Sequence, residues 1–319
     1  MTTALMLVLA GCNKQSGGGD TSAGGAAEGI SGAVTILTAS GPGGAEDLIN
    51  RLLAPKMAQA LGVDVAVKNV TGGGGLEAIQ ELNSSPADGR TLLAVSPPGE
   101  YMSKLGGAEL GDEVFTMIGS ANTDPGLIAV PKDSQFNTLA EFNDWAKSNK
   151  ANAGVTRLNS STAVFALNYF KAIGAEPQLV PYSGGSELTT GLLGGQLDVA
   201  FRAGGWYDLY PSELKILAVA DDKRIDLLPD VPTVKEAVGI DYTFDSYRGL
   251  AVKKGTPDDI AKTLSDAFEK AANDPEVKDS FYKKTGFRWQ WTPMSDMPAI
   301  QEELNKQVGD VAAQIGLRK

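Results

Sequence analysis

Short apolar runs alternate with longer amphipathic segments along most of the chain. The runs at 34–37, 91–95 and 197–201 have the length and the aliphatic composition of buried β-strands. Between such runs, segments including 48–61 and 139–147 repeat apolar residues three and four positions apart, which predicts helices that each bury one face. Because strands that alternate with helices build largely parallel sheets, the pattern predicts an α/β fold.

Two further apolar runs, at 127–130 and 247–252, are expected to carry the chain between two lobes. The length of 319 residues exceeds that of one ordinary domain, which favours two. Two crossings make the first lobe discontinuous in sequence. The predicted organisation is therefore lobe one at 33–125 and 244–319, and lobe two at 126–243.

The N-terminal residues have the pattern of a bacterial lipoprotein signal. An apolar run at 4–10 is too short to span a bilayer and leads into the tetrapeptide LAGC, which ends at Cys12. The alternative is a buried cysteine on a hydrophobic segment. We predict a lipoprotein signal peptide at 1–12 with lipidation at Cys12, followed by a Gly/Ser-rich flexible linker at 13–32.

Composition and charge exclude several classes of function. The net charge of −11 and the pI near 4.6 argue against a nucleic-acid partner, which requires clustered Lys and Arg. The chain has no histidine and a single cysteine, which removes Ser-His-Asp and Cys-His catalysis, histidine zinc sites and any intramolecular disulfide. We therefore predict no metal, no cofactor and no enzymatic activity.

A dinucleotide site is also disfavoured. The segment 73–78 formally matches the G-x-G-x-x-A fingerprint between a predicted strand and a predicted helix. That fingerprint leads to an acidic residue at the end of the next strand, where this chain has Ser96 and two prolines. No Gly-Lys-Ser or Gly-Lys-Thr of a phosphate-binding loop occurs either.

The loops that follow the predicted strands are rich in Gly, Ser and Thr. Ligands of α/β folds bind beyond the carboxyl ends of the strands, which is where these loops lie. A loop of small residues exposes backbone N–H groups at a positive helix N-terminus and can hold a carboxylate. Taken singly, the same residues are ordinary turns and helix caps. Their recurrence favours a site for a small organic anion.

Three arginines, Arg157, Arg202 and Arg248, lie at or near apolar strands, where a guanidinium can clamp a carboxylate. Arg202 is the strongest candidate, because it ends the buried strand at 199–201 and is followed closely by two glycines. The alternatives for each arginine are a structural ion pair with a nearby aspartate or plain exposure to solvent.

Two other groups of side chains have structural explanations beside functional ones. Tyr182, Trp206 and Tyr247 are candidates for walls of a cleft, although isolated aromatic residues more often belong to the core. Glu46 and Asp47 form a pair of carboxylates that could suggest acid/base chemistry. They fall in the first turn of a predicted helix, where acidic residues complement the helix dipole, and we favour that explanation.

Seven short motifs, taken in their order and spacing, resemble one known family. They are GGAED at 43–47, DGRTLL at 88–93, VPYSG at 180–184, LLGGQLDV at 192–199, LPDVPT at 228–233, GTP at 255–257 and DPEV at 274–277. This combination is similar to the periplasmic solute-binding proteins of tripartite tricarboxylate transporters, also called the Bug family. The resemblance extends from residue 34 to about residue 316.

The resemblance implies a type II periplasmic-binding fold, in which two α/β lobes joined by two crossover strands close over a ligand. It also implies delivery of that ligand to a large and a small membrane subunit. The positions that match the ligand-contacting loops of the family are Thr38, Ala39, Ser40, Gly43, Gly44, Ser96, Asn159, Ser160, Ser161, Thr162, Tyr182 and Ser183. With Arg202 and Tyr247, they form the set of candidate ligand-binding residues. Arg157 and Arg202 replace smaller or acidic residues of many members, which favours a ligand with more than one carboxylate.

The sequence therefore predicts an extracytoplasmic receptor, lipid-anchored and monomeric, for a di- or tricarboxylate or an aromatic acid. Two alternatives stay open. One is a sensory receptor, in which lobe closure over the ligand tells a signalling partner that the ligand is bound. The other is an enzyme on the same scaffold, since a fold alone does not fix a function.

Overall fold

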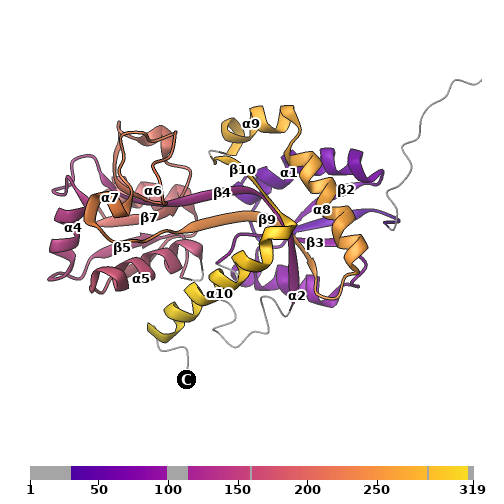
Figure 1. Cartoon of the computed structure of the whole chain (residues 1–319), viewed down its shortest axis with the longest axis horizontal. Coiled ribbons are helices and arrows are strands. Elements are labelled where there is room, and N and C mark those ends of the chain that lie inside the picture. Colours follow the sequence, from indigo (N-terminus) through magenta and orange to yellow (C-terminus); the bar gives the residue numbers. More distant parts are fainter. Residues whose placement is uncertain (1–29, 99–113, 159, 286, 315–319) are drawn as a thin grey trace, which may run out of the picture.

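The computed structural model describes residues 30–98, 114–158, 160–285 and 287–314. The predicted signal peptide with Cys12 lies outside these ranges, as does the predicted linker up to residue 29. Within them the chain forms two α/β lobes that lie side by side along the long axis of the molecule (Figure 1). No helix in the described ranges is both long enough and apolar enough to cross a membrane.

Lobe one contains a sheet with the strand order β2-β1-β3-β9-β4, in which β1 is parallel to β2 and β3. Helices α1 and α8 cover one face of this sheet, and α2 covers the other. The elements of this lobe are β1 (Val34–Thr38), α1 (Ala45–Leu61), β2 (Val65–Asn69), α2 (Leu76–Ser84), β3 (Thr91–Val95), α8 (Asp258–Ala272), α9 (Pro275–Thr285) and β10 (Trp289–Pro293).

Lobe two repeats this plan with the strand order β4-β7-β5-β6, in which β5 is parallel to β6 and β7. Its elements are α4 (Leu139–Ala146), β5 (Asn152–Val155), α5 (Ser161–Ile173), β6 (Gln178–Pro181), α6 (Gly185–Leu193), β7 (Val199–Ala203), β8 (Leu214–Ala220) and α7 (Val234–Val238). Aromatic residues fill its core: Phe165 stacks on Phe244 at 4.7 Å and meets Phe201 edge-on at 5.0 Å between ring centroids.

Two long antiparallel strands join the lobes, β4 (Phe115–Pro131) and β9 (Asp245–Lys253). Strand β4 pairs with β9 as far as Pro125, and from Gly126 onward it pairs with β7 and β8 of lobe two. Figure 1 shows both strands running between the lobes. The predicted α/β type II periplasmic-binding fold with two crossover strands is thus confirmed, while the residue limits of the lobes stay a prediction.

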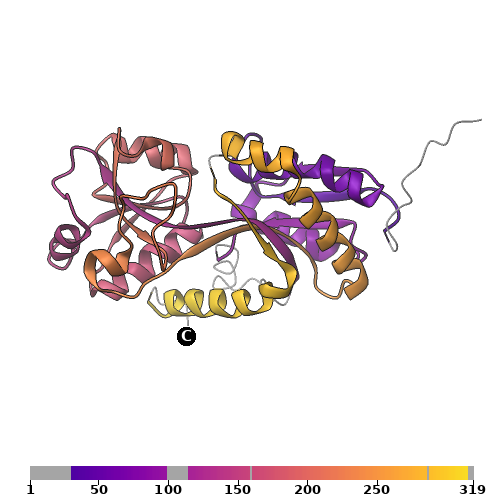
Figure 2. The same cartoon turned by 45° about the horizontal axis from the view of Figure 1, so that its top comes forward.

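A C-terminal helix, α10 (Met297–Gln314), forms a further connection between the lobes. It begins beside lobe one and extends beneath the crossing strands toward lobe two, as Figure 2 shows. There it packs against α5, and Asn168 Nδ2 donates a hydrogen bond to the Gln307 carbonyl at 3.2 Å. The segment that the sequence assigns to lobe one therefore also contacts lobe two.

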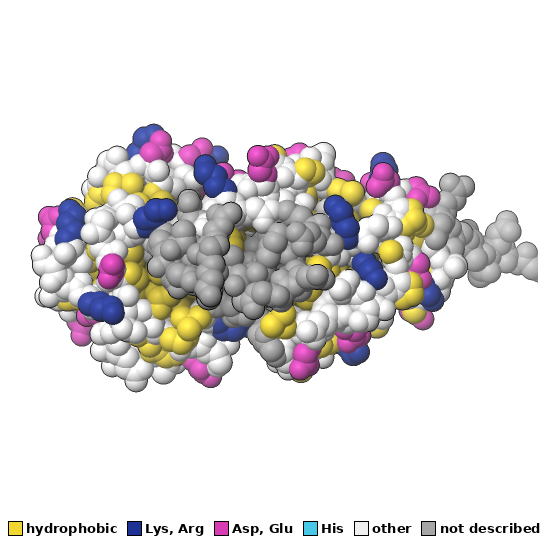
Figure 3. All heavy atoms as spheres, turned by 90° about the horizontal axis from the view of Figure 1, so that it is seen from below, with side chains coloured by type: hydrophobic (Ala, Val, Ile, Leu, Met, Phe, Trp, Pro, Cys, Tyr) yellow, Lys and Arg dark blue, Asp and Glu magenta, His cyan; other side chains and the backbone are white. Residues whose placement is uncertain are grey.

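On the face shown in Figure 3, lysine and arginine side chains are scattered among aspartate and glutamate. They do not gather into a basic stripe on that face, and a stripe of this kind is what a nucleic-acid partner requires. The sequence-based expectation of no such partner stays a prediction.

Asp245, at the start of the crossing strand β9, carries a charge that the folded state disfavours. Burial and the nearby carboxylate of Asp221, with smaller contributions from Asp124 and Asp222, raise its pKa from 3.8 to about 6, although Arg288 opposes this shift. A carboxyl group whose pKa is higher in the folded state takes up protons on folding between these two pH values. The free energy of unfolding therefore falls as the pH rises through this window, and the loss persists at neutral pH.

We expect Asp245→Asn to raise the free energy of unfolding at neutral pH. Because the side chain is only half-buried, we expect a gain of about 1 to 2 kcal/mol, less than the pKa shift alone would give. Urea unfolding at neutral pH and near pH 4 measures it, with the exposed Asp226→Asn as the control. A gain of equal size at both pH values would contradict the explanation, because Asp245 is mostly protonated at the lower one.

Candidate functional site

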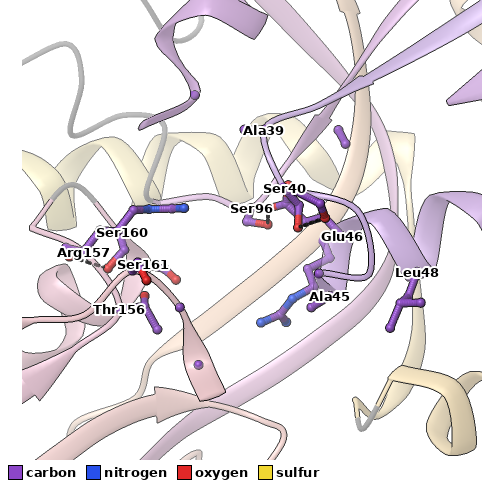
Figure 4. A pocket seen from close by; sticks show the side chains of 18 of the residues that line it. Ala39, Ser40, Ala45, Glu46, Leu48, Ser96, Thr156, Arg157, Ser160 and Ser161 are labelled. Carbon is purple, nitrogen blue, oxygen red and sulfur yellow. Dashed lines mark hydrogen bonds between the residues drawn. The ribbon is translucent and has the colours of Figure 1, made fainter. Parts of the chain in front are cut away.

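A cavity of about 940 Å3 lies between the lobes and is lined by residues of both. Figure 4 shows Ser40, Glu46 and Ser96 on the lobe-one side, facing Thr156, Arg157, Ser160 and Ser161 on the lobe-two side. The lobe-one wall is formed mainly by the loop between β1 and α1. The lobe-two wall is formed by the loops before α5 and α6 and by the end of β7.

The first loop, between β1 and α1, is held in place by a buried carboxylate. Asp47 accepts hydrogen bonds from Gly43 N at 2.9 Å, from Asn69 Nδ2 at 2.7 Å and from Arg51 Nε at 3.0 Å. Asn69 Nδ2 also donates to the Ser40 carbonyl at 2.8 Å, and Gly43 takes a positive φ of 78°. Asp47 thus fixes the loop from within the first turn of α1, where acidic residues were expected.

Burial alone would raise the pKa of Asp47, but the hydrogen bonds from Arg51, Gly43 and Asn69 together lower it below its ordinary value. A carboxylate with a lowered folded-state pKa stabilises the protein above its unfolded pKa. That contribution is lost as the pH falls through the folded-state value.

We expect Asp47→Ala to lower the free energy of unfolding by about 1 to 3 kcal/mol at neutral pH, because buried donors lose their acceptor. The deficit should shrink in acid. The loosened loop should also weaken carboxylate binding by roughly tenfold. Urea unfolding and titration calorimetry measure the two effects, with Asp259→Ala, an exposed acid in the first turn of α8, as the matched control. A loss of stability equal to that of the control would contradict the assigned role.

Glu46 differs from Asp47, although both lie in the first turn of α1. Its carboxylate lines the cavity and accepts a hydrogen bond from Thr38 Oγ1 at 3.3 Å and a short one from Ser96 Oγ. Figure 4 shows this group of Ser40, Glu46 and Ser96 side chains at the lobe-one wall. The helix dipole explains the location of Glu46 in the sequence but does not account for these contacts.

The loop before α5 forms part of the lobe-two wall and is built from hydroxyl groups. Ser160 caps the helix by accepting from Ala163 N at 3.3 Å, and its own hydroxyl donates to the Arg157 carbonyl at 2.6 Å. Thr162 Oγ1 accepts from Thr156 N at 2.9 Å. These bonds fix the N-terminus of α5 at the cavity, where its partial positive charge favours an anion.

Arg202, near the end of β7, places a half-buried guanidinium against the cavity. Its Nη1 atom donates to the Gly185 carbonyl at 3.3 Å and to Thr189 Oγ1 at 3.4 Å, and the group lies 5.5 Å from the Trp206 ring. A Cβ atom on Gly185 or Gly205 would lie 2.7 Å from Nη2, so glycine leaves the room that this side chain occupies. Burial and the nearby charge of Arg248 lower the pKa of Arg202 to about 10.

Arg202 forms no ion pair with any residue in the described part of the chain. The structural ion pair that the sequence left open for an arginine instead belongs to Arg248, whose Nη1 lies 3.6 Å from the buried Asp124 carboxylate. The Arg248 guanidinium also donates to Asn122 Oδ1 at 2.6 Å and lies 3.8 Å from the centre of the Phe287 ring. Of these two arginines, Arg202 is therefore the one without a carboxylate partner in the described part of the chain.

Most of the sequence-predicted residues lie together in the lining of this cavity. These are Ala39, Ser40, Gly43, Gly44, Ser96, Ser160, Ser161, Thr162, Ser183 and Arg202. Asn159 is outside the described residues. Their contact with a ligand stays a prediction.

Three predicted residues do not line the cavity in this structure. Thr38 is fully buried behind the first loop and donates to Glu46. The Tyr182 hydroxyl donates to Gln196 Oε1 at 3.0 Å and lies over Gly191, which directs it away from the cleft. Tyr247 packs against the core that lobe one shares with lobe two, and burial raises the pKa of its hydroxyl. For both tyrosines, the core explanation fits the observed positions.

Several residues of the lining were not in the predicted set. Glu46, Thr156, Arg157 and Arg248 are among them, as are Thr285 and Phe287. Thr285 is the last residue of α9 and Phe287 follows it before β10, far along the chain, and no local pattern marks either residue. Residues 184–187, at the start of α6, belong to the Gly/Ser-rich loop in which Tyr182 and Ser183 were predicted as ligand-binding residues.

The fold and the interlobe cavity define a two-lobed solute-binding protein of the type II periplasmic-binding class. The chain belongs to the tripartite tricarboxylate transporter receptor family, whose model matches residues 49–317. It is 32% identical over 247 residues to the "UPF0065 protein in gbd 5′ region" of Cupriavidus necator. The alignment covers 76% of this chain and 75% of the relative. Members of this family are extracytoplasmic solute-binding receptors and not enzymes.

Solved structures share the fold at lower sequence identity. MatC of Rhodopseudomonas palustris, solved with bound malate, superposes with a TM-score of 0.73 at 23% identity, over 88% of this chain and 99% of that chain. A second R. palustris protein, Rpa4515 with adipate, superposes with a TM-score of 0.75 at 22% identity, over 88% of this chain and 97% of that chain.

Proposed function

We propose that this receptor captures a small organic anion, a di- or tricarboxylate or an aromatic acid, in its interlobe cavity. The observation that carries the proposal is the half-buried Arg202 guanidinium, which has no carboxylate partner among the described residues. Partial desolvation of a charge is costly unless the charge is paired, and a ligand carboxylate would supply the partner. The N-terminus of α5 adds to the same positive field.

The structural neighbours support this ligand class. One was solved with malate and another with adipate, and both ligands are dicarboxylates. The cavity of about 940 Å3 is large enough for either with room for water. We further propose that the bound anion is passed to a large and a small membrane subunit of a tripartite transporter, as the family name implies.

A thermal-shift screen of the purified protein tests the ligand class. The panel contains succinate, malate, citrate, adipate and benzoate. A ligand that binds only the folded state raises the melting temperature in proportion to the logarithm of its concentration. We expect at least one panel member to do so, and no shift with any of them would count against the proposal.

We also propose that the receptor is monomeric and is held at a membrane through a lipid on Cys12. The support is the LAGC tetrapeptide and the Gly/Ser-rich segment after it, which would serve as a tether. In cells that express the full chain, Cys12→Ser should move the receptor from the membrane fraction to the soluble fraction. Ser16→Ala, a substitution in the predicted tether, should leave it at the membrane, and an equal distribution of all three forms would refute the anchor.

A further inference from the structure

The lobe-one wall of the cavity contains a carboxylate, although the cavity as a whole suits an anion. Glu46 lines the same space as Arg202 and Arg248. It lies on the lobe-one side with Ser40 and Ser96, and Figure 4 shows the Arg157 side chain directed from lobe two toward this group. The lobe-two side of the cavity therefore carries Arg157 and Arg202, and the lobe-one side carries the acceptor Glu46, with Arg248 of the crossing strand β9 beside it in a small adjoining pocket.

Several donors at the lobe-one wall are already engaged by the protein. The hydroxyls of Thr38 and Ser96 donate to Glu46. In the first loop, Ser40 N donates to Thr38 Oγ1 at 3.3 Å, Gly43 N to Asp47 Oδ2 at 2.9 Å and Gly44 N to the Gly41 carbonyl at 2.9 Å. A ligand carboxylate placed beside Glu46 would meet a like charge.

Contacts with the described residues use only part of the hydrogen-bonding capacity of the Glu46 carboxylate. Each oxygen receives one hydroxyl, Ser96 on Oε1 and Thr38 on Oε2, whereas a carboxylate has about four acceptor positions. The group that satisfies the remaining positions without charge repulsion is a hydrogen-bond donor such as a ligand hydroxyl. A donor of this kind would take the place that a second carboxylate would otherwise occupy.

We propose that Glu46 is a specificity-determining residue that selects ligands with a carboxylate at one end and a hydrogen-bond donor at the other. The carboxylate faces Arg202 and the donor faces Glu46. This inference rests on the proposed capture of a carboxylate and goes beyond it, because within that class it disfavours a simple dicarboxylate relative to the hydroxy acid of the same length. Like charges set side by side are an effective means of rejecting the wrong partner.

Titration calorimetry with two matched pairs of probes tests the inference. Succinate is compared with γ-hydroxybutyrate, and adipate with ω-hydroxyhexanoate, on the wild type, on Glu46→Gln and on the exposed control Glu269→Gln. We expect the wild type and the control to bind the hydroxy acid of the better-fitting pair at least about tenfold more tightly than its diacid. Glu46→Gln should lower this ratio by about tenfold, because a neutral amide no longer repels the second carboxylate.

The outcomes separate the inference from the function on which it rests. If the wild type binds diacid and hydroxy acid alike, or prefers the diacid, and Glu46→Gln leaves the ratio unchanged, the role of Glu46 is refuted while carboxylate binding stands. If no member of either pair binds and the wider panel is also negative, the proposed function itself fails. Thermal unfolding of Glu46→Gln verifies that the variant is folded, so that an unchanged ratio counts against the inference.

Discussion

Arg202→Met is expected to weaken carboxylate binding by about a hundredfold or more while leaving the unliganded receptor at least as stable as the wild type. The half-buried guanidinium lies beside neutral acceptors at 3.3 and 3.4 Å, and desolvation together with the charge of Arg248 already lowers its pKa to about 10. In the free protein its charge is therefore a cost. In the complex the same charge pairs with the ligand carboxylate. The substitution therefore removes an ion pair that exists only in the bound state.

Calorimetry for binding and urea unfolding for stability measure the two halves of this prediction. Arg202→Lys keeps the charge but loses the planar fork, and we expect it to bind between the wild type and Arg202→Met. The control is Arg224→Met, which removes an exposed lobe-two arginine that pairs with Glu236 outside the cavity. If Arg202→Met bound the carboxylate with unchanged affinity, Arg202 would have a structural role only.

Asp124→Ala is expected to lower the free energy of unfolding by about 3 to 5 kcal/mol, the largest loss of stability predicted for this chain. Asp124 is fully buried on the crossing strand β4. Its carboxylate accepts from the Tyr207 hydroxyl at 2.6 Å and from Asn122 Nδ2 at 2.8 Å, and it lies 3.6 Å from Arg248 Nη1. Removing it leaves a buried cation and buried donors without their acceptor.

Urea unfolding measures this loss, and Asp124→Asn is the informative comparison. The amide keeps the shape and one acceptor oxygen, so we expect a smaller loss of stability than in Asp124→Ala. A loss below about 1 kcal/mol in Asp124→Ala would contradict the assigned role of this carboxylate.

The α/β architecture was predictable because its signals are local. The apolar run at 34–37 and the helical periodicity after it are properties of neighbouring residues, and both elements form where expected. Strand β4 was predicted only in its apolar C-terminal part at 127–130, although it extends from Phe115 to Pro131. Its other half includes Asn122 and Asp124, polar residues whose buried partners lie more than eighty positions away.

The loops that form the candidate site were predictable from the sequence, but the roles of its charged side chains were not. Gly and Ser in the first loop identified the lobe-one wall, since tight turns at a helix N-terminus require such residues. The sequence pattern could not distinguish Glu46 from Asp47, because both occupy the first turn of α1. Only the tertiary structure shows that Asp47 turns inward to hold the loop while Glu46 faces the cavity.

The central claim is that the cavity recognises the negative charge of a carboxylate through Arg202 and its neighbours. The most direct measurement is a calorimetric comparison of the carboxylate that gives the largest thermal shift with its uncharged amide of the same shape. We predict one-to-one binding of the carboxylate and a loss of about a hundredfold or more for the amide. Equal affinity for the two compounds would contradict the claim.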